Sequence, residues 1–334
     1  MSDKTKLISI VIPVKNGEPW LQDCLDAITK QTLFPQSEII ILDSGSTDST
    51  MEILKNFPVR IFPIAPVEFN HGLTRNFGVE QANGEYVVMT VQDAKPTDDL
   101  WLQKLVDGFS AADNVAGVCG QQIVAHDKDK NPVDWFRPYS EPEMIIKRID
   151  SIDTYELLSP QERKNSCGWD DVTAMYRKEV LLQIPFQKVS YGEDALWAQD
   201  ALKKGYTLVY NFAARVYHYH QEDWDFTFKR TLTVMYLWYK NFGFLPAKPK
   251  TTFRGFLQMI KLIVIAKPLS LKEKWNWFLY NKERRRAMDE AYKTFFEALN
   301  VSEKKLDEVH EKFCGKPPMP LKPLNNSHSY KESA

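Results

Sequence analysis

The chain has 334 residues, of which 43% are hydrophobic and 26% charged, the composition of an ordinary globular protein with one large domain or two smaller ones. Its formal net charge of −1 argues against a generic nucleic-acid binder, so we expect no nucleic-acid partner. The four cysteines lie far apart without a CxxC pair, so we expect reduced thiols. The sequence has no signal-peptide layout, so we expect a cytoplasmic protein. It also has no apolar run of ~18 residues, so we expect no membrane span.

The first half of the chain alternates predicted strands and helices. Apolar runs predict strands at 7–14, 38–42, 59–64 and 86–89, and the segments between them predict helices at 18–30, 48–56 and 71–82. This alternation is typical of parallel strands joined by right-handed crossovers, and nearly continuous apolar runs are typical of strands buried on both faces. We therefore expect an α/β fold with a mostly parallel central sheet flanked by helices.

The next part of the chain is less regular. Its sequence predicts a helix from about 99 to 109 and a strand at 115–124, followed by an irregular excursion at 126–165 that we expect to line one side of a ligand site. Two further helices are predicted, one at 175–184 and one that follows 191–194 and ends at Gly205. A short strand at 207–210 and an alternating segment at 215–220 come last.

A change in composition begins at Phe228. Residues 228–290 contain 14 Lys or Arg and 4 Asp or Glu, a net charge of about +10, with aromatic residues interleaved. This pattern is typical of a helical surface that lies on an anionic membrane; a helical extension that packs its aromatic residues on the main domain is the alternative. We expect three parts: a main domain at 1–227, a basic, aromatic-rich helical extension at 228–315 and a flexible tail at 316–334.

A carboxylate follows the central predicted strand. The run at 86–89 leads to Gln92 and Asp93 and breaks at Pro96, so Asp93 lies at the carboxyl end of a strand, where ligands bind in open α/β sheets. We expect Asp93 to hold a divalent cation that in turn holds the diphosphate of a nucleotide sugar. The alternative is an aspartate that only caps the next helix.

Several common catalytic motifs do not occur. The sequence has no GxGxxG after the first strand and no GxxxxGK[ST], HExxH or GxSxG. These absences disfavour a dehydrogenase, a P-loop NTPase, a zinc protease and a serine hydrolase.

Four segments in order resemble inverting glycosyltransferases of family 2 with the GT-A fold. They are ISIVIPVKNG, ILDSGSTDST, HGLTRNFGVEQANGEYVVMTVQDA and YGEDALWAQDALKKGY, and the resemblance covers about residues 7–220. EFNHGLTRN followed by QDA resembles the bacterial rhamnosyltransferase branch, which builds O-antigen and other surface polysaccharides from dTDP-rhamnose. The resemblance implies transfer of a hexose, rhamnose in the narrower match, to a lipid-linked or oligosaccharide acceptor at the inner face of the cell membrane.

The resemblance also implies a binding site for the nucleotide sugar. Its residues would be Pro13, Val14, Lys15, Asn16, Asp43, Ser44, Arg75, Gln92 and Asp93. The sequence departs from the family pattern at Ser44, where a second acidic residue is usual, and at Val91-Gln92-Asp93, which keeps only the last of two aspartates. One carboxylate with diphosphate oxygens and waters can still hold Mg²⁺ or Mn²⁺.

A histidine often completes the metal site in this family. His218 and His220 both qualify, because residues two apart on an alternating run point to the same face. We prefer His218 as the ligand, and imidazole suits Mn²⁺ better than Mg²⁺. A core or surface role is the alternative for either histidine.

Glu193-Asp194 matches the acidic pair that precedes a helix in the family. Inversion needs a base that deprotonates the acceptor hydroxyl, and we assign Asp194 as that base and Glu193 as its orienting neighbour or an acceptor contact. We expect the helix dipole to keep Asp194 ionised; a helix cap is the alternative. Trp169, Asp170 and Asp171 are expected to line the sugar or acceptor pocket.

Two other functions stay open. A sugar-nucleotide pyrophosphorylase would need a Gly-rich, basic loop soon after the first strand, and Lys15-Asn16-Gly17 is a poor version of it. A non-catalytic carbohydrate-binding subunit is suggested by the weakened metal motif. The glycosyltransferase hypothesis requires Asp93 and Asp194 to share one cleft.

Overall fold

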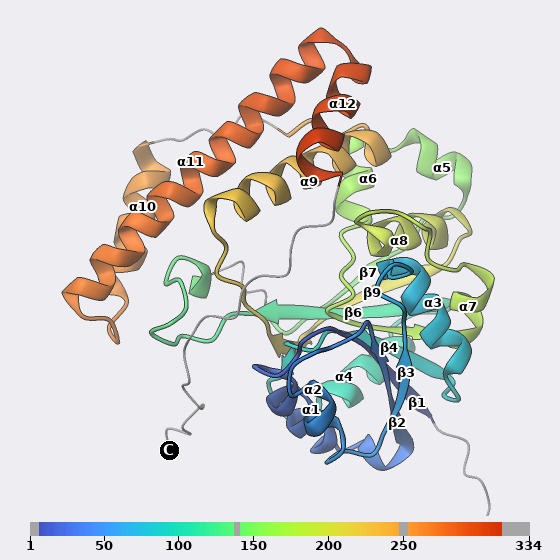
Figure 1. Cartoon of the computed structure of the whole chain (residues 1–334). Coiled ribbons are helices and arrows are strands. Elements are labelled where there is room, and N and C mark those ends of the chain that lie inside the picture. The colour runs from blue at the N-terminus through green and yellow to red at the C-terminus, as the bar shows by residue number, and fades with distance from the viewer. Residues whose placement is uncertain (1–6, 137–140, 247–252, 316–334) are drawn as a thin grey trace, which may run out of the picture.

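A mixed sheet with helices on both faces forms the body of the molecule, and the C-terminal helices lie along one side of it (Figure 1). The computed structural model describes residues 7–136, 141–246 and 253–315. The predicted tail at 316–334 lies outside the described residues.

The sheet has the strand order β3-β2-β1-β4-β8-β6-β9-β5, and β7 pairs with β9. The strands are β1 (Ile8–Val14), β2 (Ser37–Asp43), β3 (Val59–Pro63), β4 (Tyr86–Thr90), β5 (Lys95–Pro96), β6 (Val115–Ile123), β7 (Met144–Lys147), β8 (Thr173–Arg177) and β9 (Thr207–Tyr217). The pairs β1–β2, β2–β3 and β1–β4 are parallel, which confirms the predicted α/β sheet. β8 is antiparallel to both β4 and β6.

Twelve α-helices occur in the described residues. They are α1 (Leu21–Thr29), α2 (Thr50–Leu54), α3 (His71–Gln81), α4 (Trp101–Asp107), α5 (Ile152–Leu157), α6 (Pro160–Ser166), α7 (Lys178–Gln183), α8 (Glu193–Lys203), α9 (Trp224–Phe242), α10 (Phe253–Ile265), α11 (Leu271–Val301) and α12 (Glu303–Cys314).

Two hydrophobic cores lie on opposite faces of the sheet. Along β1, Ile10 and Ile12 point into the core covered by α1, α2 and α4, whereas Val11 points into the core covered by α3, α7 and α8. This burial on both faces explains why the strand sequences are nearly continuous apolar runs. A Cβ on Gly78 would lie 2.5 Å from Val11, so glycine allows α3 to approach β1 closely.

Two predictions about secondary structure are wrong. The segment 175–184 is not one helix but the end of β8 followed by α7, because Ala174 and Tyr176 face one core and Met175 faces the other. The short strand at 207–210 is the start of β9, which continues to Tyr217. The excursion at 126–165 contains β7, α5 and part of α6, with 137–140 outside the described residues.

The C-terminal helices have a core of their own. α9 begins at Trp224, shortly before the composition changes, and packs against α11 and α12. Tyr236 stacks on His310 with ring centroids 3.9 Å apart, and Tyr239 meets Phe295 edge to face at 6.1 Å. Tyr236 and Tyr239 of α9 therefore pack against the other C-terminal helices. Of the helices that can be described, none is long and apolar enough to cross a membrane.

Candidate active site

The first two loops of the sheet interlock beside the ends of β1 and β2. Lys15 Nζ donates to the carbonyl oxygens of Ser44 (2.8 Å) and Gly45 (3.0 Å). The Asp43 carboxylate accepts from the backbone N–H of Gly45 (3.1 Å) and from the hydroxyl of Ser46 (2.6 Å). These contacts place the predicted nucleotide-binding residues of the two loops side by side at the carboxyl ends of β1 and β2.

Gln92 ties β4 to the first of these loops. Its side-chain oxygen accepts from the Lys15 N–H at 2.9 Å, and its side-chain nitrogen donates to the Lys15 carbonyl at 3.1 Å. Because both polar ends of the amide are bound to backbone, Gln92 fixes the loop beside Asp93. We assign Gln92 this positioning contact, and its expected contact with the nucleotide stays a prediction.

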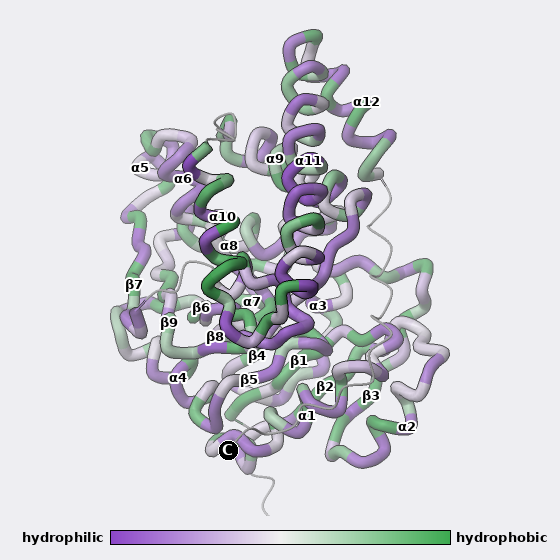
Figure 2. The backbone as a smooth tube through the Cα atoms, turned by 90° about the vertical axis from the view of Figure 1, so that its left-hand side faces the viewer, coloured by the Kyte–Doolittle hydropathy of each residue, from purple (hydrophilic) through white to green (hydrophobic). Residues whose placement is uncertain are grey.

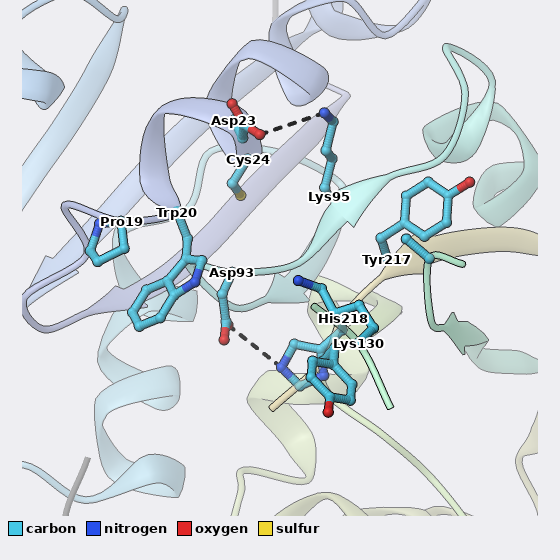
Figure 3. Close-up of a pocket in the computed structure, with 11 residues that line it drawn as sticks. Pro19, Trp20, Asp23, Cys24, Asp93, Lys95, Lys130, Tyr217 and His218 are labelled. Atoms are coloured by element: carbon cyan, nitrogen blue, oxygen red, sulfur yellow. Dashed lines mark ion pairs between the residues drawn. The ribbon is translucent and has the colours of Figure 1, made fainter. Parts of the chain in front are cut away.

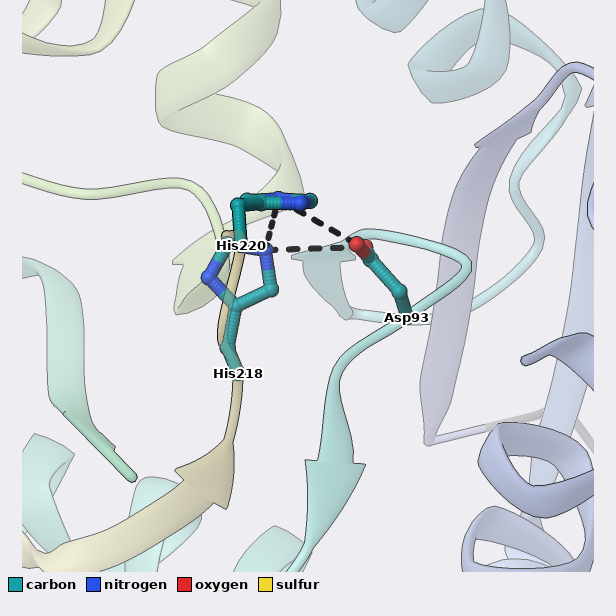
Figure 4. A group of neighbouring side chains, drawn as sticks. All are labelled: Asp93, His218 and His220. Carbon is teal, nitrogen blue, oxygen red and sulfur yellow. Dashed lines mark hydrogen bonds and ion pairs between the residues drawn. The ribbon is translucent and has the colours of Figure 1, made fainter. Parts of the chain in front are cut away.

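Asp93, His218 and His220 form a cluster of three possible metal ligands (Figure 4). His218 Nε2 lies 3.5 Å and His220 Nε2 3.2 Å from the Asp93 carboxylate, and the two ring nitrogens are 2.9 Å apart. Asp93 follows β4, and both histidines follow β9. The sequence prediction that the two histidines face the same side is therefore confirmed.

These separations fit one octahedral cation. Ligands about 2.1 Å from such an ion lie about 3 Å apart when they occupy adjacent positions, close to the 2.9–3.5 Å observed here. Burial lowers the pKa of His220 to about 4, so its ring is neutral at physiological pH and able to ligate. The pKa of Asp93 is also lowered, because the nearby imidazoles outweigh the opposing effect of its burial. The donor set thus fits Mn²⁺ or Mg²⁺.

Gln122, at the end of β6, orients one of these ligands. Its side-chain oxygen lies 2.7 Å from His218 Nδ1; because an amide oxygen only accepts, Nδ1 carries the hydrogen and Nε2 is free to face Asp93. The side-chain nitrogen of Gln122 donates to the Asp170 carboxylate. Gln122 therefore connects the metal-ligand cluster to the next group of acidic residues.

That second group consists of Asp170, Asp171, Glu193 and Asp194, and the guanidinium of Arg75 interacts with the last three. Arg75 pairs with Glu193 and lies 3.3 Å from Asp171, and all three side chains are at most 8% exposed. The sequence analysis expected Arg75 to approach the nucleotide phosphates. In the structure its guanidinium instead neutralises part of the acidic group.

Asp194 lies in the first turn of α8, and its environment makes it a weak acid. Its pKa is raised well above the ordinary value, first by burial and then by the charges of Asp171, Glu193 and Asp170. Burial and the neighbouring carboxylates therefore act against the helix dipole, which favours the ionised form of Asp194. The capping alternative is wrong, because the N-cap of α8 is Gly192 and Asp194 accepts only from the adjacent Ala195 N–H.

The residues expected to line the sugar pocket separate in the structure. Trp169 is 5% exposed, donates to the Tyr176 hydroxyl at 2.7 Å and packs against Trp197, so its ring has no open face for a sugar. Asp171 accepts from the same Tyr176 hydroxyl. Asp170 is partly exposed and bound to Gln122. Of the three, Asp170 is the one placed to meet a ligand.

A hollow of about 70 Å³, open to solvent, lies beside the metal-ligand cluster (Figure 3). Asp93 and His218 line one side of it, and Trp20, Lys95 and Lys130 line others. Asp194 does not line this hollow. Gln122 links Asp170 to His218 by hydrogen bonds, and Asp194 interacts with Asp170 through charge repulsion. The requirement that Asp93 and Asp194 share one cleft is therefore not met by this hollow.

Sequence reasoning missed three residues of this region. Gln122 is a strand residue that no motif marks. Arg230 of α9 pairs with Glu222, and Tyr191 interacts with both Arg230 and the acidic group. Arg230 also contributes to the lowered pKa of His220, which places its charge near the metal-ligand cluster. The basic composition of the C-terminal segment was the only signal for it.

The fold is that of the GT-A glycosyltransferases. The mannosyltransferase PcManGT from Pyrobaculum calidifontis, solved with GDP-Man and Mn²⁺, has a TM-score of 0.51 and 16% identity, over 93% of this chain and 87% of its own. TarS 1–349 from S. aureus in complex with UDP-GlcNAc has a TM-score of 0.50 and 16% identity, over 92% and 80%. At such identities the likeness extends to the fold alone.

The chain belongs to glycosyl transferase family 2, whose family model matches residues 9–184. The O-antigen chain rhamnosyltransferase WbaN of Salmonella anatum is 31% identical over 222 residues, and RfbN of Salmonella typhimurium is 32% identical over 222 residues. In both comparisons the match spans 64% of this chain and 66% of the relative.

Proposed function

We propose that this protein is an inverting glycosyltransferase that moves a hexose from a nucleoside diphosphate to a glycan acceptor. The observation that carries the proposal is the cluster of Asp93, His218 and His220, which Gln122 joins by hydrogen bonds to Asp170, a member of the acidic group that also contains Asp194. A donor whose diphosphate is held beside Asp93 would have its sugar near the acidic group that contains Asp170 and Asp194.

Asp93, His218 and His220 would hold a divalent cation. When bound, the cation balances the charge of the leaving nucleoside diphosphate. The loops that contain Lys15, Asn16 and Asp43 would hold the nucleoside at the carboxyl ends of β1 and β2. Arg230 would add a positive charge near the diphosphate.

Asp194 would act as the base. The acceptor hydroxyl attacks the anomeric carbon from the face opposite the phosphate, and its proton passes to the Asp194 carboxylate as the new bond forms. A raised pKa suits this role, because it makes the ionised carboxylate a stronger base. Glu193, bound to Arg75, would fix the first turn of α8 that carries Asp194.

Rhamnose from dTDP-rhamnose is the donor we infer, with surface polysaccharide synthesis as the setting and a lipid-linked or oligosaccharide acceptor. The support is that two relatives at 31% and 32% identity are named O-antigen chain rhamnosyltransferases and that EFNHGLTRN followed by QDA resembles that branch. Contact of the 228–290 segment with a membrane is part of the same proposal.

The experiment combines donor binding with turnover. Thermal unfolding is measured with dTDP-rhamnose, UDP-GlcNAc and GDP-Man, each with and without Mn²⁺, and release of nucleoside diphosphate is then followed for the donor that binds. We expect Mn²⁺-dependent stabilisation by dTDP-rhamnose, and Asp194→Asn should keep this stabilisation while turnover falls by about 10² to 10⁴. Near wild-type turnover in Asp194→Asn with intact donor binding would disprove the assignment of the base.

The same samples separate the two alternatives. Release of pyrophosphate from a nucleoside triphosphate and a sugar phosphate would indicate a pyrophosphorylase. Glycan binding without turnover of any donor would indicate a non-catalytic subunit.

A further inference from the structure

Helix α10 and the start of α11 expose large apolar side chains on the outside of the molecule. In Figure 2, α10 lies toward the viewer and is coloured largely as hydrophobic. Its sequence is FRGFLQMIKLIVI, and only Met259 and Ile263 are buried. The exposed residues, which we call the apolar patch, are Phe253, Phe256, Leu257, Val264, Ile265, Leu271, Trp275 and Leu279.

The apolar patch contains several strongly exposed side chains on two consecutive helices, whereas exposed apolar residues on soluble proteins are usually scattered singly. Phe253 is 75% exposed, Leu271 87% and Trp275 61%. At helical spacing, Phe253, Leu257 and Val264 fall on one stripe of α10. A contiguous exposed apolar surface of this kind marks an interaction site.

The charges around the patch indicate its partner. Residues 253–272 contain Arg254, Lys261, Lys267 and Lys272 and no acidic residue. Lys261, Lys267 and Lys272 are exposed. Basic residues beside an apolar helix face are suited to an anionic bilayer, because the apolar side chains enter the interface while the basic groups meet the lipid headgroups. A two-fold dimer through the same surface would place these like charges against each other.

The patch is attached directly to the active-site region. Ala266, Leu269 and Trp277 of the α10–α11 corner form one hydrophobic cluster with Val124 and Trp135 of the loop that follows β6. The same loop supplies Lys130 to the hollow beside Asp93. It is also held to α11 by the ion pair between Asp134 and Arg284, at 2.8 Å.

We propose that α10 and the first two turns of α11 bind the surface of an anionic phospholipid bilayer. The contact is made by the apolar patch and by its basic rim, which consists of Lys261, Lys267 and Lys272. The membrane contact expected for 228–290 is thereby narrowed to α10 and the start of α11, because Phe228, Tyr236 and Tyr239 of α9 pack among the C-terminal helices. The relevance to a lipid-linked acceptor rests on the proposed function, since such an acceptor would meet the active-site loop at the membrane surface. The bilayer contact itself does not depend on catalysis.

The test uses the full chain and two kinds of vesicle, phosphatidylcholine alone and phosphatidylcholine with 30% phosphatidylglycerol, in co-sedimentation at low and high salt. We expect binding to the anionic vesicles only, weakened by salt because the basic rim is screened. The variant Leu257→Glu/Leu271→Glu should bind at least about tenfold more weakly, because two apolar side chains are replaced by charges that the lipid headgroups repel.

Leu157→Glu is the matched control, because Leu157 is 86% exposed on α5, outside the patch. It should bind as the wild type does. Unfolding midpoints show whether all variants fold, and Mn²⁺-dependent stabilisation by the donor, measured on the same samples, reports on the proposed function separately. Vesicle binding without donor binding would support this inference while the proposed function fails.

Absence of wild-type binding to anionic vesicles would overturn the proposal. Equal loss in Leu157→Glu would overturn it as well. A third contrary outcome is a wild-type dimer in light scattering that Leu257→Glu/Leu271→Glu converts to a monomer, because the patch would then join two copies of the chain.

Discussion

Arg75 is the cation that allows a group of buried carboxylates to coexist, and its removal should be costly. Its guanidinium is 6% exposed and pairs with Glu193, which is 8% exposed, and with Asp171, which is 2% exposed. Arg75→Met removes the positive charge with little change in volume and leaves both carboxylates buried. Loss of one member of a buried ion pair costs about 3–5 kcal/mol, so we expect a decrease of that size in the free energy of unfolding at pH 7.

The assay is urea unfolding followed by tryptophan fluorescence between pH 5 and pH 8. The deficit of Arg75→Met relative to the wild type should shrink toward pH 5, because protonation of the carboxylates removes the uncompensated charges. Arg286→Met is the control: Arg286 pairs with Glu283 at 2.6 Å, but the two side chains are 60% and 53% exposed, so its cost should stay below about 1 kcal/mol. A cost below about 1 kcal/mol for Arg75→Met, unchanged with pH, would refute the role given to Arg75.

Three further predictions concern the metal site and the acidic group. Asp93→Asn should abolish Mn²⁺-dependent stabilisation by the donor nucleotide in thermal unfolding, since it removes the one charged ligand; full retention would place the cation elsewhere. Gln122→Leu should weaken Mn²⁺ affinity by about 10- to 100-fold in calorimetric titration, because His218 loses the acceptor that fixes its ring, and unchanged affinity would contradict this. Burial raises the pKa of Asp171 to about 6, so its stabilising contribution is complete below the unfolded value near 4 and is lost as pH rises through about 6, a change of about 3 kcal/mol. Asp171→Asn should flatten this decline in urea unfolding, and an identical pH profile would exclude the effect.

The parallel part of the sheet could be predicted because its strands carry their own signal. β1, β2 and β4 are buried on both faces, and such strands require apolar runs that a sequence displays directly. β8 could not be recognised in this way. Its sequence TAMYR is short and lacks a run of β-branched residues, and the apolar residues of α7 that follow it extend a helical spacing back across it.

The candidate site was predictable where a residue's position on its own element decides its role. Asp93 ends a central strand, and the two histidines share a face of an extended segment, so both facts are visible in the sequence. The role of Gln122 depends on β6 lying next to β9, and the raised pKa of Asp194 depends on Asp170 and Asp171 from a distant segment. Such effects arise only from tertiary contacts.

Burial of the C-terminal helices likewise depends on tertiary contacts that the sequence does not display. α9 and α10 both belong to the basic segment, yet α9 is covered by α11 and α12 whereas most of α10 is exposed. The burial of each helix is decided by the helices that pack against it.

The most direct test of the account is anomalous diffraction from crystals soaked with Mn²⁺ and a nucleoside diphosphate. The account predicts one strong peak bound by the Asp93 carboxylate and by His218, His220 or both, with diphosphate oxygens as further ligands. A nucleotide bound with its cation among Asp170, Asp171, Glu193 and Asp194 instead, or bound at the loops of Lys15 and Asp43 with no cation near Asp93, would contradict it.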